Sequence, residues 1–148
     1  MRITAFSDVC LRVVMILAAV PQPALTTAQV VADGVGTPYN HVSKAIIRLR
    51  ELGLVTVVRG RAGGVSISEA GRTVTVGWLL RRLDTRTDVA ACESPNGPCP
   101  LLAGCGLRGA LSRAREAFYG ELDDLVIATL PHSRGSGPVL VGLTTGPA

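Results

Sequence analysis

TPYNHVSKAIIRLRELGLVTVVRGRAGGVSIS, residues 37–68, is the stretch that decides the fold. Thr37 suits a helix N-cap, Pro38 suits the first helical position, and Gly53 follows the last helical residue, so the stretch predicts a helix between them. Apolar side chains recur at helical spacing and share one face of this helix. They are Val42, Ile46, Leu49 and Leu52. Polar side chains are left on the opposite face.

Two alternating runs follow this helix, LVTVVR and GVSIS, and the segment 60–64, GRAGG, joins them. Alternation of apolar and polar residues is typical of half-buried strands, and a short glycine-rich connection is typical of a hairpin. The second half of the stretch therefore predicts a β-hairpin with a basic, glycine-rich tip.

Upstream, two short helices are predicted. Ser7 suits the N-cap of the first, whose apolar residues recur at helical spacing from Val9 to Val20, and Pro21 ends it. Thr26 or Thr27 then opens a second helix, which Gly34 closes.

Downstream, a helix is predicted over residues 69–84 with Ser68 as its cap, followed by a Gly- and Pro-rich loop at 85–104. A long helical pattern covers 105–130. Its apolar stripe consists of Leu107, Leu111, Ala114, Phe118, Leu122 and Leu125. Pro131 stops the helix, and residues 131–148 read as a flexible tail.

This order of elements predicts a mostly α protein with one small hairpin, in which residues 1–84 form a winged helix-turn-helix that binds double-stranded DNA. Residues 1–84 carry ten Lys/Arg against five Asp/Glu, which favours an anionic partner. The candidate groove contacts are Tyr39, Asn40, His41, Ser43, Lys44 and Arg48, and the candidate wing contacts are Arg59 and Arg61. A solvated helix beside an ordinary hairpin is the plainer alternative, and His41 is equally well explained as a surface residue.

Three cysteines mark the loop and its end: Cys92, Cys99 and Cys105, spaced C-x6-C-x5-C. Three thiolates on one loop suit a soft metal centre, and their odd number prevents complete pairing as disulfides. Iron–sulfur ligation completed by a fourth, non-cysteine ligand is favoured. A zinc site completed by a carboxylate and a thiol switch with one disulfide remain open.

The same residues carry a family resemblance. MRITAFSDVCLRVVMILA, the stretch 37–68 and the three loop cysteines together resemble the Rrf-two superfamily of bacterial regulators, over about residues 1–130. Within it, the chain is most similar to cluster-containing repressors that sense nitric oxide and control nitric-oxide detoxification genes. The resemblance implies a homodimer, with 105–130 as the dimerisation helix and 85–104 as the cluster-binding loop.

The resemblance also implies the cluster ligands. Cys92, Cys99 and Cys105 would each bind one iron, and Asp8 of the other subunit would supply the fourth ligand. The segment GLRGAL, after the third cysteine, lacks the histidine used by the cluster-status regulators of the superfamily. A 4Fe–4S cluster is favoured over 2Fe–2S. As an alternative role, Asp8 would simply stabilise the dipole of its helix.

Two neighbours of Asp8 have their own expected roles. Arg12 lies four residues on and is placed to pair with it, which would couple the cluster to the DNA-binding half. Cys10 falls with the apolar set and is expected to be a buried structural residue.

No motif suggests an enzyme, and the longest apolar run, residues 13–20, is too short to span a membrane. Together with these observations, the resemblance implies a cytoplasmic, dimeric repressor that responds to nitric oxide. An iron- or cluster-status sensor, or a thiol- or zinc-based regulator without a cluster, is the alternative.

Overall fold

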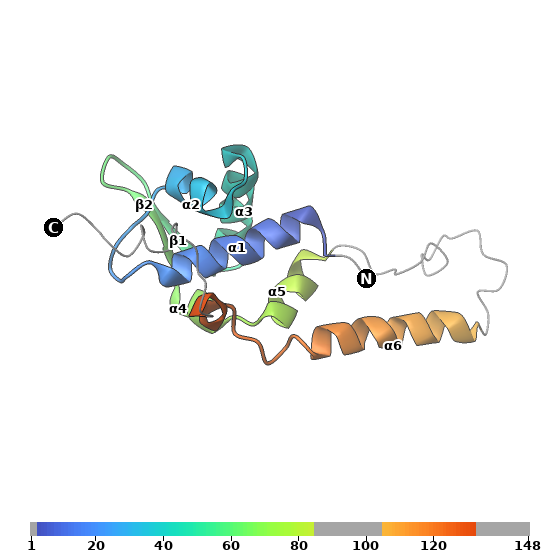
Figure 1. The fold of residues 1–148 in the computed structure, drawn as a ribbon. Coiled ribbons are helices and arrows are strands. Elements are labelled where there is room, and N and C mark those ends of the chain that lie inside the picture. Colours follow the sequence, from blue (N-terminus) through green and yellow to red (C-terminus); the bar gives the residue numbers. More distant parts are fainter. Residues whose placement is uncertain (1–2, 85–104, 133–148) are drawn as a thin grey trace.

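The computed structural model describes residues 3–84 and 105–132. It is mostly helical with one two-stranded antiparallel sheet, which confirms the predicted fold class (Figure 1). In chain order the elements are α1 (Ala5–Ala19), α2 (Ala28–Val35), α3 (Tyr39–Glu51), β1 (Val55–Val58), β2 (Gly64–Ile67), α4 (Glu69–Thr73), α5 (Val76–Leu83), α6 (Gly106–Gly120) and the 3-10 helix η2 (Ile127–His132).

The core forms around α1, which lies between α2 and α3 on one side and α4, α5 and η2 on the other (Figure 1). Cys10, Val13 and Leu17 of α1 are fully buried, as are Leu49 of α3 and Ile127 of η2. Burying such side chains contributes about 1.5–3 kcal/mol each. The helix that begins the chain is thus the element on which the others pack.

The ends of the first two helices differ from prediction. Thr4, and not Ser7, caps α1, because its hydroxyl oxygen accepts a hydrogen bond from the Ser7 backbone N–H at 3.1 Å. Ser7 lies inside the first turn and is buried. Thr27 caps α2 as predicted, but the helix continues past Gly34 and ends at Gly36, whose φ of 68° is the left-handed conformation that favours glycine.

The third helix begins at Tyr39, one residue later than predicted, with Pro38 at the N-cap position. Its end is as predicted, since Gly53 follows in a left-handed conformation with φ 75°. Val42, Ile46 and Leu49 are buried against the core. The opposite face remains at the surface.

The hairpin is present as predicted. Strand β1 pairs with β2 from Val55 opposite Ile67 to Val58 opposite Gly64. Thr26, just before α2, forms a bridge to Val65 of β2 through two backbone hydrogen bonds of 3.0 and 2.7 Å. The wing is therefore fixed to the helix-turn-helix.

The helix predicted over 69–84 is two helices, α4 and α5. The chain is extended at Val74 and Thr75, and Thr75 forms a β-bridge with Val126. Backbone hydrogen bonds from Ile127 N–H to the Val74 carbonyl and from Val76 N–H to the Leu125 carbonyl complete this junction. Pairing with a segment fifty residues away breaks the helix.

The same junction ends α6 early, so the prediction of one helix over 105–130 was wrong. Helix α6 stops at Gly120, and the chain turns to bring Leu125 to Val76 and Ile127 to Val74. Most of α6 projects from the body (Figure 1), and within residues 106–120 only Tyr119 is buried. No helix among the described residues is long and apolar enough to cross a membrane.

Candidate functional site

The residues predicted to enter the major groove lie on the first turns of α3. Tyr39, Asn40, His41 and Lys44 are exposed, and Ser43 is half-buried. They are held at the surface because Val42 and Ile46, on the other face of the same turns, are anchored in the core. This end of α3 offers hydrogen-bond donors and acceptors, which base edges in a groove require.

Arg48, also predicted to contact DNA, is partly engaged within the fold. Its Nη1 lies 3.1 Å from Glu51 Oε2, and its Nη2 donates to the Arg82 carbonyl oxygen at 3.4 Å. These contacts hold the guanidinium toward the end of α3, one turn or more from the other predicted contacts.

The wing places its two arginines as the sequence analysis expected. Arg59 and Arg61 are exposed on either side of Gly60, whose φ of 110° is open to glycine but strained for other residues. The Gly63 N–H closes the turn on the Gly60 carbonyl at 3.0 Å. Two cations on a tight turn suit contacts with phosphates.

Asp8 and Arg12 form the ion pair that their spacing predicts. Asp8 Oδ2 lies 2.9 Å from Arg12 Nη2, and Arg12 Nε donates to Asp8 Oδ1 at 3.2 Å. The Asp8 side chain is nevertheless 49% exposed and stands in the first turn of α1. A second subunit can therefore reach this carboxylate without unfolding α1.

Cys105 is a free, half-buried cysteine at the N-cap position of α6, while Cys92 and Cys99 lie outside the described residues. The N-terminal end of a helix favours negative charge, as on a metal-bound thiolate. Within residues 3–84 and 105–132, no three side chains of the metal-binding types gather at one place. An exposed carboxylate and a thiol at a helix end fit an iron–sulfur cluster, but neither completes a site alone.

Cys10 is unsuited to ligation. It is fully buried in α1, and burial raises the pKa of its thiol to about 12, although Arg48 opposes this shift weakly. A thiol that keeps its proton is a poor metal ligand. The expectation that Cys10 is structural is supported.

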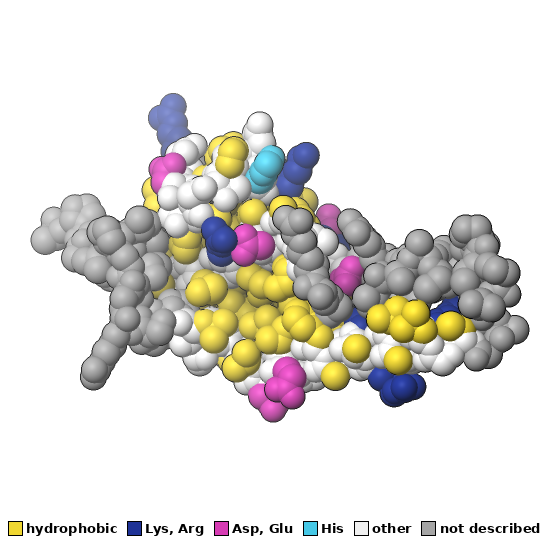
Figure 2. All heavy atoms as spheres, turned by 45° about the vertical axis from the view of Figure 1, so that its right-hand side comes forward, with side chains coloured by type: hydrophobic (Ala, Val, Ile, Leu, Met, Phe, Trp, Pro, Cys, Tyr) yellow, Lys and Arg dark blue, Asp and Glu magenta, His cyan; other side chains and the backbone are white. Residues whose placement is uncertain are grey.

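The face that joins α1 to α6 is strongly apolar. Figure 2 shows hydrophobic side chains gathered over the body of the molecule and along α6. The large apolar side chains that remain exposed among the described residues include Ile3 at 40%, Phe6 at 39% and Leu107 at 61%. Large exposed apolar surfaces commonly mark protein–protein contacts.

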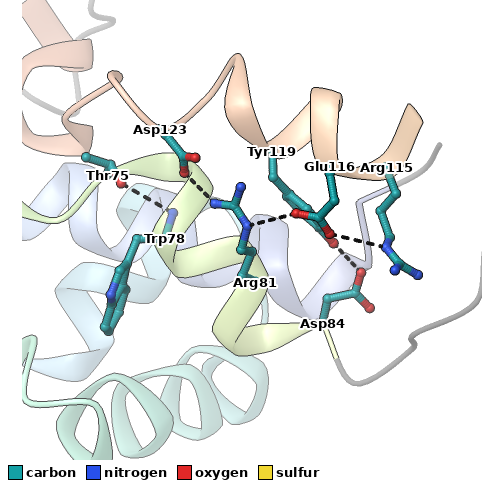
Figure 3. A network of polar contacts seen from close by, with 8 residues as sticks. All are labelled: Thr75, Trp78, Arg81, Asp84, Arg115, Glu116, Tyr119 and Asp123. Carbon is teal, nitrogen blue, oxygen red and sulfur yellow. Dashed lines mark hydrogen bonds and ion pairs between the residues drawn. The ribbon is translucent and has the colours of Figure 1, made fainter. Parts of the chain in front are cut away.

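Sequence analysis singled out no polar residue at the contact between α5 and α6, where the structure forms a network of ion pairs and hydrogen bonds (Figure 3). Tyr119, which lies on the same side of α6 as the apolar stripe, could have indicated this contact. A buried tyrosine hydroxyl commonly has a hydrogen-bond partner.

The helix order, the surface position of α3 and the paired hairpin define a winged helix-turn-helix regulator of transcription. The chain belongs to the Rrf2 family, described as an iron-dependent transcriptional regulator, whose profile matches residues 3–133. A family of regulators is not an enzyme class, so the expectation of no enzymatic activity is confirmed.

The chain is 48% identical over 151 aligned positions to the HTH-type transcriptional repressor NsrR of Streptomyces coelicolor (strain ATCC BAA-471 / A3(2) / M145), covering 100% of this chain and 99% of that protein. Among solved structures, the oxidized form of Staphylococcus aureus CymR matches with a TM-score of 0.68 and 19% identity, covering 90% of this chain and 98% of CymR. The IscR of T. potens matches with a TM-score of 0.66 and 18% identity, covering 88% and 85%. These two likenesses show the fold.

Proposed function

We propose that the protein is a homodimeric repressor that binds double-stranded operator DNA in the cytoplasm and holds an iron–sulfur cluster, 4Fe–4S rather than 2Fe–2S. Nitric oxide is the proposed signal, and nitric-oxide detoxification genes are the proposed targets. The observation that carries the proposal is the 48% identity to the NsrR repressor along the whole chain. The family's iron dependence agrees with it.

On the DNA side, the first turns of α3 would enter a major groove about 12 Å wide. Tyr39, Asn40, His41, Ser43 and Lys44 are the proposed groove contacts, with Arg48 at the far end. Arg59 and Arg61 would reach phosphates or the minor groove from the wing. The net positive charge of residues 1–84 would draw the domain to DNA.

On the cluster side, Cys92, Cys99, Cys105 and Asp8 of the partner subunit are the proposed ligands. Cys105 offers its thiol at the start of α6, and Asp8 offers an exposed carboxylate on α1. When bound, the cluster supplies iron atoms that react with nitric oxide. A carboxylate is a harder ligand than a thiolate, so it binds iron–sulfur iron less firmly and suits a site that must respond.

The proposed dimer is supported by α6. A helix of fifteen residues with one buried side chain is marginal by itself, because packing of an apolar face supplies most helical stability in proteins. Leu107, at 61% the most exposed large apolar side chain among the described residues, lies two residues after Cys105 on this helix. Packing against a second copy would cover that face and bring Asp8 of each subunit toward the other's cluster loop.

Asp8 and Arg12 would couple the two sides. Arg12 holds both carboxylate oxygens of Asp8 in the single chain, so ligation by Asp8 must compete with or reorient this pair. A shift of the pair is transmitted to α1, on which α3 packs. Weakening DNA binding tenfold needs a difference of only about 1.4 kcal/mol between the two arrangements.

The test is a nitric-oxide titration of anaerobically purified protein, following visible absorbance and operator binding in the same samples. An operator fragment is obtained first, by selecting random duplexes that the cluster-loaded protein retains. We expect a straw-brown protein whose absorbance and DNA affinity fall together. Colourless protein with stoichiometric zinc, or bleaching without any change in DNA binding, would contradict the proposal.

Cysteine variants make the ligand assignment testable. Cys99→Ser should abolish both cluster binding and specific DNA binding while leaving the fold intact by circular dichroism. Cys10→Ala is the matched control, since it removes a cysteine from the core and should keep the cluster. Operator binding retained by Cys99→Ser would refute the cluster-dependent mechanism.

A further inference from the structure

Asp84, the residue before the cluster loop, is hydrogen-bonded to α6, the helix that follows the loop. Asp84 is the last described residue before segment 85–104, and the hydroxyl of Tyr119 donates a hydrogen bond to Asp84 Oδ2 (Figure 3). Tyr119 lies in the last turn of α6, whereas Cys105 stands at the start of the same helix. Both ends of the loop are thus fixed to one helix.

Neighbouring side chains hold the Tyr119 ring in place, so that its hydroxyl points toward Asp84. The Arg81 guanidinium lies over the ring, 5.0 Å from its centroid, and the Phe118 ring meets it edge to face at 5.6 Å. Tyr119 is 5% exposed. Burial, together with the bond to Asp84, raises the pKa of Tyr119 to about 12, so the hydroxyl keeps its proton near neutral pH and remains a donor.

The helices that carry the two residues are themselves closely docked. Arg81 Nη1 is paired with Asp123 Oδ1 at 2.5 Å, and Arg81 Nε lies 3.8 Å from Glu116 Oε2. Gly77 allows this approach, because a Cβ there would lie 2.7 Å from the Tyr119 carbonyl oxygen. These contacts dock α5 on α6, whereas the bond from Tyr119 reaches Asp84, the residue next to the loop in the sequence.

We propose that the Tyr119–Asp84 hydrogen bond is a positioning pair that fixes the base of the cluster loop, and we call it the loop clamp. It rests on the proposed function, since it assigns a role toward the cluster. The two anchored points, Tyr119 and Cys105, are about 20 Å apart along α6 at the usual helical rise. Holding them fixed lowers the entropy that must be lost when three cysteines are brought to one centre.

Tyr119→Phe is the direct test, because it removes the hydroxyl and keeps the ring and its packing. The readout is the rate at which anaerobically reconstituted protein loses iron to a chelator, followed by visible absorbance. We expect loss about tenfold faster, which corresponds to about 1.4 kcal/mol and is near the lower end for a hydrogen bond to a charged group. Asp84→Asn, whose amide oxygen still accepts from Tyr119, should lie between Tyr119→Phe and the wild type.

A second readout needs no cluster. Trypsin can cut after Arg86, two residues beyond Asp84, and the clamp should slow this cut in the apo-protein. We expect several-fold faster cleavage in Tyr119→Phe, measured at a temperature well below the thermal midpoints of both proteins. Cleavage of Asp84→Ala should be at least as fast as that of Tyr119→Phe, and adding Tyr119→Phe to Asp84→Ala should accelerate it no further, because the acceptor of the Tyr119 hydroxyl is already gone.

Asp123→Asn is the matched control, since it weakens the α5–α6 contact through Arg81 but keeps the Tyr119 hydroxyl and the Asp84 carboxylate that form the clamp. It should change neither the rate of iron loss nor the rate of tryptic cleavage by more than about twofold. Equal acceleration in Asp123→Asn and Tyr119→Phe would assign the effect to general docking of the helices and overturn the clamp. Wild-type rates in Tyr119→Phe would do the same. A wild-type protein that binds no cluster would instead sink the proposed function, and the trypsin assay would still decide the clamp.

Discussion

The ion pair between Asp8 and Arg12, to which we assign a role in the proposed cluster site, contributes little to the stability of the fold. Both side chains are about half exposed and lie four residues apart on α1. Exposed pairs of this kind contribute about 0–1 kcal/mol to stability. The pair is thus free to change partners at small cost, as a ligand that must be released requires.

Asp8→Ala should lower the free energy of unfolding of the apo-protein by less than about 1 kcal/mol, the usual worth of an exposed pair and a first-turn carboxylate. It should nevertheless accelerate loss of the cluster. Chemical denaturation and the absorbance decay of reconstituted protein measure the two effects. Asp33→Ala is the control, because Asp33 is also exposed and bonded to a side chain four residues away, Gln29. An unchanged decay in Asp8→Ala would assign Asp8 to the helix dipole alone.

Cys10 leads to a prediction about reactivity. Its pKa of about 12 keeps the thiol protonated at pH 8, and its side chain is inaccessible. Native apo-protein treated with iodoacetamide should therefore leave Cys10 unlabelled, while denatured protein labels all four cysteines. Mass spectrometry of tryptic peptides measures this. Rapid labelling of native Cys10 would contradict the buried assignment.

The same shift has a consequence for stability. A thiol whose pKa is raised on folding contributes stability that is fully present below its ordinary pKa of 9.0. That contribution is lost as the pH rises from 9.0 toward about 12, since the unfolded chain then releases the proton that the folded chain retains.

At the scale of elements, the proposed DNA contacts are divided between the wing and α3. Arg59→Ala should weaken operator binding and reduce the slope of log affinity against log salt by about one, the change expected for one lost phosphate contact. Arg72→Ala, on α4, removes the same charge away from the wing and should keep the slope. Salt titrations by fluorescence anisotropy compare the two variants. Equal slopes in wild type and Arg59→Ala would remove Arg59 from the interface.

Elements set by local signals were the ones that sequence could predict. The stretch 37–68 contains its own start, stop and turn residues, so α3 and the hairpin appear within a residue of expectation. The cap of α1 was missed by one turn because Thr4 and Ser7 are equally suitable hydroxyl residues, and only packing chooses between them.

Elements set by distant pairing could not be predicted in this way. The helical pattern runs unbroken through 69–84 and through 105–130, but Thr75 pairs with Val126 and interrupts both. The residues near Thr75 in the sequence give no indication that it pairs with Val126. For the same reason the contact of Tyr119 with Asp84 was not foreseen, whereas Asp8 and Arg12, four residues apart, were.

For the whole molecule, α6 is the element on which the proposed dimer depends. Leu107→Glu should convert the proposed dimer to a monomer, because it places a charge on the exposed apolar face of α6. Sedimentation equilibrium measures the change. Ile47→Glu, on an exposed apolar residue of α3 at 47%, is the control and should remain dimeric. A Leu107→Glu variant that stays a dimer would place the interface elsewhere.

The projecting helix also makes protein concentration a variable of the proposed sensor. If the fourth ligand comes from the second copy, dissociation of subunits and loss of iron are linked equilibria, and each shifts the other by mass action. The cluster would then stabilise the dimer, and dilution alone would make the cluster more labile. In a cell with few copies of this regulator, the cluster would be lost more readily, and the repressor released from DNA more readily, than in a cell with many copies.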